Sequence, residues 1–241
     1  SRDQQVTVAP ETGTDRLRRV INKHLTNEQI RDICRSIFEE GILNLKLYFM
    51  VGLPHETQED VAGIVDFVRE LQMTMVNASR RFGRLGSLVI SLNCFVPKPN
   101  TPFQWARVED ERSLQRKSDF ITHGLRTIPN VRISVMPPRE AHLQTILSLG
   151  DRSVTAFILK AHELDGNWRR AAQLLGVTAH RFTRPKPGIN EVLPWEVMDL
   201  GISKVFLMNE WHKASEAKFS ASCPDTNGCA VCGVCPPGVT K

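Results

Sequence analysis

Short apolar runs alternate with longer segments of helical periodicity from the start of the chain to Val135. The apolar runs predict strands at residues 5–9, 43–51, 87–95 and 131–135. The periodic segments predict helices at residues 15–22, 27–40 and 109–125, and a helix that opens at Thr57 and continues through Leu71. Strands and helices that alternate at these lengths predict a parallel sheet built from βαβ units.

The pattern changes after about residue 137, where helical segments dominate. Helices are predicted at residues 140–149, 154–164, 168–175 and 203–219. The last stretch is polar and rich in glycine and proline, so we expect it to order only when its cysteines bind something. We therefore predict three parts: an α/β part at residues 1–136, a helical part at 137–219 and a cysteine-rich tail at 220–241.

Composition places the chain among globular proteins of one large domain or slightly more. It has 241 residues, 41% of them hydrophobic. No apolar run approaches the length of a membrane span, and the polar start is not a signal peptide. The sequence does not begin with Met, so we expect a fragment of a longer protein. Four of the six cysteines lie within the last twenty residues, which favours metal binding in a reducing cytoplasm over disulfide bonds.

The net charge of +5 leaves two interpretations open. One is contact with a polyanion such as RNA, and the other is an ordinary, mildly basic surface. Because the excess is small and spread along the chain, the second is favoured.

Three predicted strand ends carry unusual sequence. They read PETGT at residues 10–14, GLPHET at residues 52–57 and VPKPNTP at residues 96–102. Ligands of parallel sheets bind at the carboxyl ends of strands, so these three segments are the candidate site.

The same segments resemble the radical S-adenosylmethionine (SAM) enzymes. LYFMVGLPHETQEDV, at residues 47–61, resembles the fifth barrel strand and following helix of that family. VAPETGTDRLRRVINK, at residues 8–23, resembles the preceding unit, and FVPKPNTPFQW, at residues 95–105, resembles the end of the sixth strand. The resemblance implies an incomplete parallel β/α barrel of the TIM type, followed by a mainly helical region.

The cobalamin-associated branch of the family is the most similar. Its members end with a segment like DLGISKVFL, found here at residues 199–207, and with a cysteine-rich tail. Whether cobalamin is used stays open, because any domain that binds it lies outside this sequence. The C-x3-C-x2-C loop that holds the catalytic [4Fe–4S] cluster is also not in this sequence. By itself the chain is therefore expected not to cleave SAM.

The resemblance implies the activity of the whole protein: reductive cleavage of SAM to a 5′-deoxyadenosyl radical. It implies an electron donor such as ferredoxin or flavodoxin, and no membrane partner. It does not specify the substrate, which could be a small molecule, an RNA or a protein.

The resemblance also implies residues that contact SAM. Relatives place a polar acceptor and a basic residue twelve positions apart, and Glu11 and Lys23 match this spacing, with Thr12 beside the acceptor. A carboxylate there can accept hydrogen bonds from the SAM amino group or ribose, and a cation can meet the SAM carboxylate. The alternative is an acidic residue favoured near a helix start and a solvated lysine at a helix end.

The turn of Gly52, Leu53 and Pro54 is expected to face the adenine or ribose, with glycine permitting close approach. Some relatives carry Asp four residues before this glycine, where this chain has Tyr48, its only tyrosine. Tyr48 is therefore a core, substrate-facing or SAM-contacting residue. His55 is either part of the pocket or an exposed loop residue.

The tail has the spacing of a metal site. Its cysteines are Cys223, Cys229, Cys232 and Cys235, and two successive C-x2-C steps followed by C-P resemble the bacterial ferredoxin run. Zinc also takes four thiolates, typically as two separate C-x2-C pairs. The spacing favours an auxiliary iron–sulfur cluster and leaves a zinc site open.

A rival function also stays open. The barrel remnant could be a non-catalytic scaffold whose basic surface and four-cysteine zinc tail form an RNA-binding module. A C-x3-C-x2-C loop encoded upstream of Ser1 would decide for the enzyme.

Overall fold

The computed structural model of the chain describes residues 4–183, 188–223, 229 and 231–235. The chain divides into two compact units. Unit 1 comprises Ser1–Phe95, Glu109–Pro138 and Ala217–Phe219, and unit 2 comprises Val96–Val108, Arg139–Glu216 and Ser220–Lys241. The domain boundaries at residues 136 and 219 stay a prediction.

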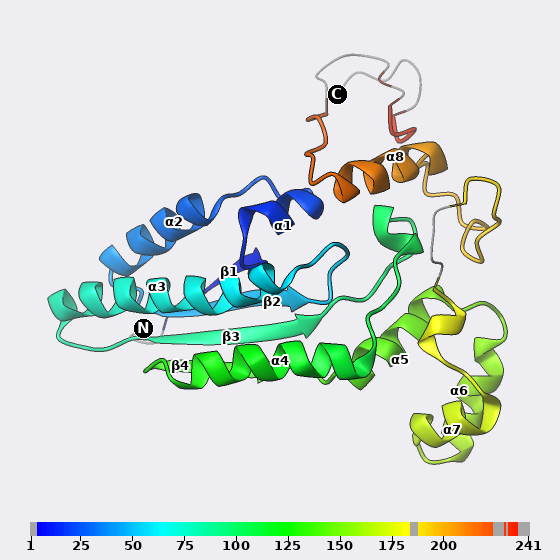
Figure 1. Cartoon of the computed structure of the whole chain (residues 1–241), viewed down its shortest axis with the longest axis horizontal. Helices are drawn as coiled ribbons and strands as arrows, with labels where there is room; N and C mark the ends of the chain where they lie inside the picture. Colours follow the sequence, from blue (N-terminus) through cyan, green and yellow to red (C-terminus); the bar gives the residue numbers. More distant parts are fainter. Residues whose placement is uncertain (1–3, 184–187, 224–228, 230, 236–241) are drawn as a thin grey trace. The chain divides into compact units, whose positions relative to one another are not determined.

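Within its described residues, unit 1 holds a four-stranded parallel sheet in the order β1-β2-β3-β4 (Figure 1). The strands are β1 (Gln5–Glu11), β2 (Asn44–Val51), β3 (Ser87–Cys94) and β4 (Val131–Val135). All three neighbouring pairs are parallel. The α/β fold class predicted from the alternating pattern is therefore confirmed.

Four helices connect these strands along the chain. They are α1 (Asp15–Val20), α2 (Asn27–Glu39), α3 (Gln58–Phe82) and α4 (Glu111–Arg126). Each begins with a side chain that satisfies a free backbone N–H group: Thr14, Thr26, Thr57 and Asp110. At the start of α3, Thr57 and Asp60 form a capping box.

The two faces of the sheet differ. In β2, the side chains of Leu45, Leu47 and Phe49 are fully buried, whereas the residues between them are half-buried. The Phe49 ring meets Phe67 of α3 edge to face at 6.2 Å, so the helices cover the buried face. Strands that follow in sequential order, joined by right-handed crossovers, place their helices on one side. This arrangement is that of part of a β/α barrel, with the half-buried face on the inside.

Unit 2 is mainly helical in its described part. Its elements are η1 (Pro102–Trp105), α5 (Pro138–Leu149, which begins in unit 1), α6 (Val154–Glu163), α7 (Trp168–Leu175), η2 (Ala179–Arg181) and α8 (Lys204–Ser215). The ring of Trp211 in α8 packs edge to face against Trp105 at 6.4 Å. The indole N–H of Trp195 donates to buried Gln104 at 2.7 Å. Through these contacts, residues 96–108 pack against Trp195 and Trp211, which come later in the sequence of unit 2.

The last helix predicted from the sequence extends further than the helix in the structure. It was expected to run to Phe219, but α8 ends at Ser215. Ala217 has a φ of 51°, a left-handed conformation that a right-handed helix cannot contain.

Two features of the described residues bear on the class of protein. None of the described helices combines the length and the apolar character needed to cross a bilayer. All six cysteines lie within the described residues, and none of them forms a disulfide.

Candidate functional site

The first two candidate segments meet at one edge of the sheet. Glu11 is the last residue of β1, and Gly52 follows the last residue of β2. The two strands are parallel neighbours, with Glu11 opposite Phe49. The ETGT and GLP segments therefore emerge side by side at the carboxyl ends of the strands, where ligands of such sheets bind.

Glu11 and Lys23 form an ion pair. Lys23 Nζ lies 3.0 Å from Glu11 Oε1 and also donates to the backbone carbonyl of Ala9. The two side chains are 25% and 26% exposed, so the pair is reachable from solvent. The residues that the sequence matched by their spacing are thus in contact, with opposite charges available at the end of β1.

The backbone at Glu11 is irregular. The β1–β2 register shifts between Val8 and Glu11, so β1 carries one more residue than its partner there. Glu11 also has a φ of 67°, a left-handed conformation that costs a non-glycine residue free energy. Such bulges occur next to active sites, where they redirect a side chain. The conformation therefore marks Glu11 as a residue whose direction is constrained by its surroundings.

A buried arginine, Arg18, holds this conformation. Its side chain is 0% exposed. Its Nε donates to Pro10 O at 2.9 Å, and Nη2 donates to Thr12 O at 2.8 Å, so one guanidinium binds the carbonyls on both sides of Glu11. Nη1 pairs with Asp15 Oδ1 at 2.7 Å. The arginine thus satisfies two backbone acceptors of the irregular turn.

Thr12 and Gly13 face the protein interior. Thr12 is fully buried, and its hydroxyl donates to Thr14 O at 3.0 Å. A Cβ added to Gly13 would stand 2.3 Å from the backbone nitrogen of Ile64, so only glycine allows the turn to approach α3 this closely.

Asp60 joins the two candidate segments. Its carboxylate is 2% exposed and accepts from the Thr14 hydroxyl, the Arg16 guanidinium and the Thr57 N–H. Burial acts to raise the pKa of Asp60, but these hydrogen bonds outweigh it, and the pKa is lowered. The β1 end and the start of α3 are therefore connected through one buried carboxylate.

The Gly52 turn is fixed by packing and by a carboxylate. Gly52 has a φ of 80°, and an added Cβ would lie 2.5 Å from Leu114 of α4. Its N–H lies 3.1 Å from both carboxylate oxygens of Glu56. Leu53 is buried, and Pro54 is half-buried. The positive φ and the close packing against Leu114 therefore explain why position 52 is a glycine, without a bound ligand.

Glu56 belongs to a small charged cluster. Lys117 Nζ lies 2.7 Å from Glu56 Oε1 and 2.6 Å from Glu109 Oε2. The pKa of Glu56 is raised, chiefly because its side chain is 2% exposed, while Lys117 opposes the rise. Burial acts to lower the pKa of Lys117, but the two carboxylates outweigh it and raise it. The cluster keeps the turn attached to α4.

Tyr48 lies on the half-buried face of β2, level with Ser91 of β3. The ammonium group of Lys46 stands 4.8 Å from the centre of its ring. Tyr48 is therefore not part of the core beneath the helices. Its contact with SAM or substrate stays a prediction.

His55 adopts a left-handed conformation, with a φ of 62°, and its carbonyl accepts from Arg16 Nη2 at 2.7 Å. Partial burial and the positive charge of Arg16 lower the pKa of its imidazole. The neutral ring is favoured at neutral pH.

The four tail cysteines are described, although residues 224–228, 230 and 236–241 between and after them lie outside the described residues. Cys223 is exposed, and the other three are half-buried. Among the described residues, no three His, Cys, Asp or Glu side chains are gathered closely enough to hold a metal ion. The metal site stays a prediction, and its ligands are not assembled in this structure.

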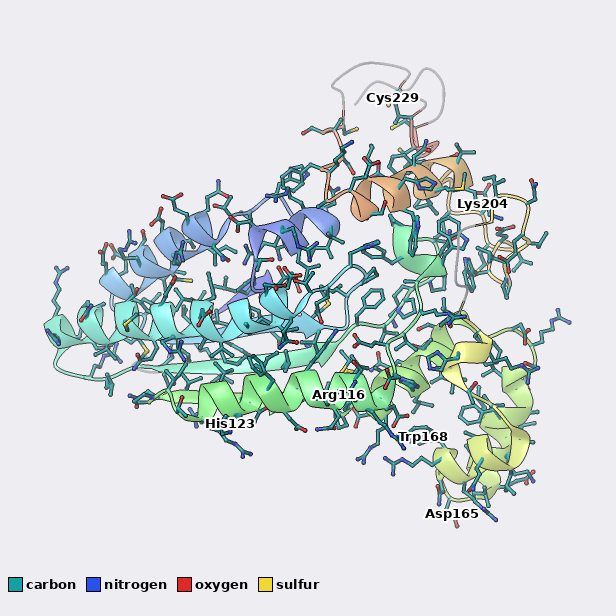
Figure 2. All side chains as sticks on the ribbon, in the orientation of Figure 1. Arg116, His123, Asp165, Trp168, Lys204 and Cys229 are labelled. Atoms are coloured by element: carbon teal, nitrogen blue, oxygen red, sulfur yellow. The ribbon has the colours of Figure 1, made fainter. Side chains whose placement is uncertain are left out.

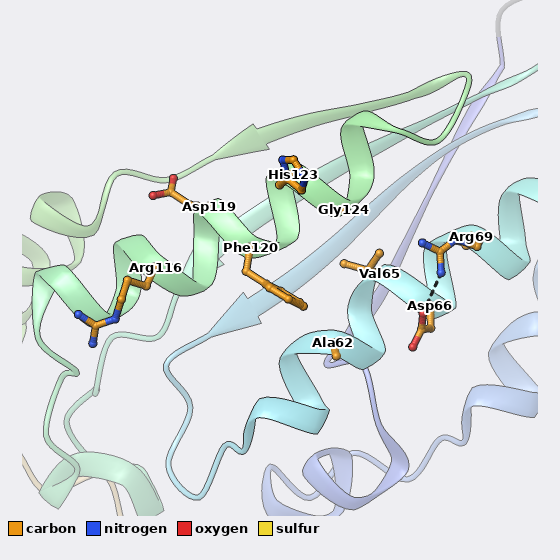
Figure 3. A pocket seen from close by; sticks show the side chains of 9 residues that line it. All are labelled: Ala62, Val65, Asp66, Arg69, Arg116, Asp119, Phe120, His123 and Gly124. Atoms are coloured by element: carbon orange, nitrogen blue, oxygen red, sulfur yellow. Dashed lines mark hydrogen bonds and ion pairs between the residues drawn. The ribbon is translucent and has the colours of Figure 1, made fainter.

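A groove of about 600 Å³ opens between α3 and α4 (Figure 3). Phe120 projects into it, and charged side chains such as Asp66, Arg69 and Arg116 surround it. It contains none of the predicted SAM-contacting residues, so the candidate site is the strand-end surface itself.

Sequence reasoning missed Arg18, Glu56, Asp60, Glu109 and Lys117 as parts of this site. Glu56 and Asp60 stand inside the GLPHETQED segment that carried the family resemblance, and their spacing from Gly52 and Thr57 was the available signal. Two of the partners of Arg18 are backbone carbonyls, which leave no trace in the sequence.

Comparison with known proteins supports the resemblance. The sequence model of the radical SAM superfamily matches residues 2–68. An uncharacterized protein of Methanocaldococcus jannaschii is 29% identical over 154 residues, which is 64% of this chain and 32% of that protein. The aligned part thus covers about a third of the relative's length. No solved structure matches the chain. The resemblance to the radical SAM superfamily is confirmed over the part of the chain that carries the Glu11 turn and the Gly52 turn.

Proposed function

We propose that this chain is part of a radical SAM enzyme and supplies one wall of its SAM site. The observation that carries the proposal is the Glu11–Lys23 ion pair, which lies at a strand end within the segment matched to the superfamily. The amino-acid end of SAM carries an ammonium and a carboxylate. An accessible carboxylate and ammonium 3.0 Å apart present the two opposite charges that such a zwitterion requires.

Each side of the ion pair has a separate role in this proposal. Glu11 accepts from the amino group of SAM, and Lys23 turns to its carboxylate. The hydrogen bonds from Arg18 keep the Glu11 turn in place when the internal ion pair opens. Binding therefore replaces one ion pair with two and requires little change in the backbone.

In the whole enzyme, a reduced [4Fe–4S] cluster would supply the one electron that cleaves SAM into methionine and a 5′-deoxyadenosyl radical. The C-x3-C-x2-C ligands of that cluster are not in this sequence, so the contribution of this chain is to bind and orient SAM. The half-buried sheet face with Tyr48 would line the inside of the completed barrel. An electron donor such as ferredoxin or flavodoxin, a cytoplasmic location and the cobalamin branch are parts of the same proposal.

The test is SAM affinity in the complete protein, measured by calorimetry. Glu11→Ala should weaken binding about tenfold or more, because the charge-assisted hydrogen bond from the SAM amino group to Glu11 is lost. Glu39→Ala, at an exposed position near the end of α2, is the matched control and should leave the affinity unchanged. An unchanged dissociation constant for Glu11→Ala would remove this residue from the site.

We also propose that the tail binds an auxiliary iron–sulfur cluster. The support is the C-x5-C-x2-C-x2-C-P spacing, together with four thiols of which none is in a disulfide. Anaerobic reconstitution with iron and sulfide should give a brown protein with about four irons per tail cluster. A colourless protein that holds a single zinc ion would contradict the cluster and favour the zinc alternative.

A further inference from the structure

Unit 2 contains a small polar pocket of its own. The pocket has a volume of about 290 Å³, near the lower end of the range for small-molecule sites. Two parts of the chain line it: residues 100–104, which follow β3, and residues 196–207, which lead into α8. Both parts belong to unit 2, and none of the residues given a role in SAM binding lines the pocket.

The buried side chain of Gln104 leaves one donor of this pocket unused. Gln104 is 2% exposed, and its Oε1 accepts from the Trp195 indole N–H at 2.7 Å and from the Asn100 N–H at 3.1 Å. Two donors directed at one atom identify that atom as the amide oxygen. The amide nitrogen donates to no acceptor within the described residues, whereas buried polar groups are ordinarily hydrogen-bonded. An acceptor on a bound ligand would complete the hydrogen bonds of Gln104.

The charges around the pocket do not cancel. Glu196 and Asp199 carry two negative charges and Lys204 carries one positive charge, so one negative charge remains. The ammonium of Lys204 is already bound to Glu196 Oε1 at 2.5 Å and to Glu191 O. Asp199 Oδ1 accepts from Gly201 N at 2.7 Å, and Asp199 Oδ2 accepts from none of the described residues. This balance disfavours phosphates and carboxylates and favours a ligand that brings N–H donors.

Apolar side chains stand beside these polar groups. Met198 and Leu200 line the pocket and are 59% and 60% exposed. A ligand with polar edges and apolar faces makes use of both kinds of lining. The planar bases of nucleic acids have this combination, because their edges hydrogen-bond and their faces stack.

We propose that this pocket binds a nucleobase with an exocyclic amino group, which is adenine, guanine or cytosine. The Gln104 amide donates to an acceptor on the edge of the base, and the Asp199 carboxylate accepts from its amino group. Amide and carboxylate side chains are among the groups with which proteins recognise base edges. The base belongs either to a free nucleoside or to an RNA strand. The inference concerns unit 2 alone and does not rest on the proposed SAM site.

Calorimetric titration of the full chain with matched nucleosides tests the chemistry of the ligand. Adenosine and purine riboside differ only in the amino group, as do guanosine and inosine, and uridine has a carbonyl where cytidine has its amine. We expect at least one amino-bearing nucleoside to bind about three- to tenfold more tightly than its partner, the effect of one hydrogen bond. Equal affinities within all three pairs would overturn the proposal.

Trinucleotides that contain the same bases separate the two sources of the base. A nucleoside that binds as well as its trinucleotide supports a free nucleoside as the ligand. A trinucleotide that binds where its nucleosides do not supports a base within an RNA strand, provided that the variants below weaken it. If neither kind of probe binds the native chain, the pocket is not a nucleobase site.

Substitution of Asp199 locates the ligand in this pocket. Asp199→Asn removes the charge but keeps an oxygen for the Gly201 N–H, so the fold is retained, and binding should weaken about three- to tenfold. Asp165→Asn is the matched control. Asp165, labelled in Figure 2 with Lys204, does not line the pocket, and asparagine tolerates its φ of 53°. The control should leave the affinity unchanged, and equal affinities for the two variants would overturn the proposed site.

Gln104→Glu tests the unused donor. The variant keeps an oxygen for the Trp195 and Asn100 N–H groups and replaces the amide nitrogen with a second oxygen. Binding should weaken about tenfold or more, because an acceptor then faces the acceptor of the base. Circular dichroism checks that this buried variant folds, and the exposed Asp199→Asn variant decides the question if it does not. None of these results affects the SAM site of unit 1, which is tested by the affinity of Glu11→Ala.

Discussion

The strand-end turns of unit 1 and the cysteine tail of unit 2 are both candidate ligand sites, but they are built in different ways. The turns are held by buried groups, above all Arg18 and Asp60, whose partners are all within the chain. The tail offers four thiols whose ligand geometry is not assembled among the described residues. The turns are therefore expected to keep their shape without ligand, whereas the tail is expected to gain its shape from the metal.

From this comparison, we expect substitution of Arg18 to lower the free energy of unfolding the most. Arg18→Met removes the donor of the Pro10 and Thr12 carbonyls. It also removes the cation that pairs with Asp15, whose carboxylate keeps only the Asn27 N–H among the hydrogen bonds described. Loss of one partner from a buried charged network costs about 3–5 kcal/mol of the free energy of unfolding. Urea denaturation followed by circular dichroism measures this change.

The control is Arg35→Met in α2. Arg35 is 54% exposed and pairs only with nearby Asp32 among the contacts described, so the change should cost less than about 0.5 kcal/mol. Equal costs for the two variants would show that the Glu11 turn does not depend on Arg18.

Asp60 should give the next largest effect, and one that depends on pH. Folding lowers its pKa below the ordinary value of 3.8, so the unfolded chain binds the proton more readily. Its carboxylate therefore stabilises the fold at neutral pH, and this contribution disappears as the pH falls from 3.8 through the lower folded pKa. Asp60→Asn should cost about 1–3 kcal/mol at neutral pH and progressively less in acid, as measured by denaturation at several pH values.

Asp66→Asn, on the same helix, isolates the effect of burial. Asp66 is 67% exposed and pairs with Arg69. Its removal should change the free energy of unfolding by less than about 0.5 kcal/mol at any pH. A pH-independent difference between native protein and Asp60→Asn would contradict the role given to the Asp60 charge.

The smallest effect on stability should come from the tail. Cys232→Ser removes a predicted metal ligand that belongs to unit 2, so the free energy of unfolding of the sheet in unit 1 should change by less than about 0.5 kcal/mol. Metal affinity should fall strongly in the same variant. Chelator competition measures the metal affinity, and denaturation measures the stability of the sheet, so the two effects are separated. A loss of sheet stability as large as that from Arg18→Met would contradict the expected difference between the turns and the tail.

The sequence predicted the sheet well because local signals agree. Apolar residues recur in each strand of unit 1, most densely in β2 and β3, and three helix starts carry a threonine cap. The end of α8 was missed because Ala217 gives no warning of a left-handed conformation. Its neighbours, rather than its own preference, decide its backbone angles.

The candidate site was predicted less completely. The spacing of Glu11 and Lys23 was enough to group them, and they are in contact. The reason that Glu11 adopts a left-handed conformation could not be predicted, since it depends on backbone carbonyls that meet Arg18 only after folding. Likewise, Lys117 lies 61 residues beyond Glu56 along the chain, and only the packing of α4 brings the two together.

The separation of aromatic residues between the two units has an optical consequence. All four tryptophans, Trp105, Trp168, Trp195 and Trp211, belong to unit 2, whereas the single tyrosine, Tyr48, belongs to unit 1. Light at the long-wavelength edge of aromatic absorption excites tryptophan alone, so the emission reports unit 2 without a contribution from the sheet. The native chain therefore carries its own fluorophores for following metal-dependent changes in unit 2.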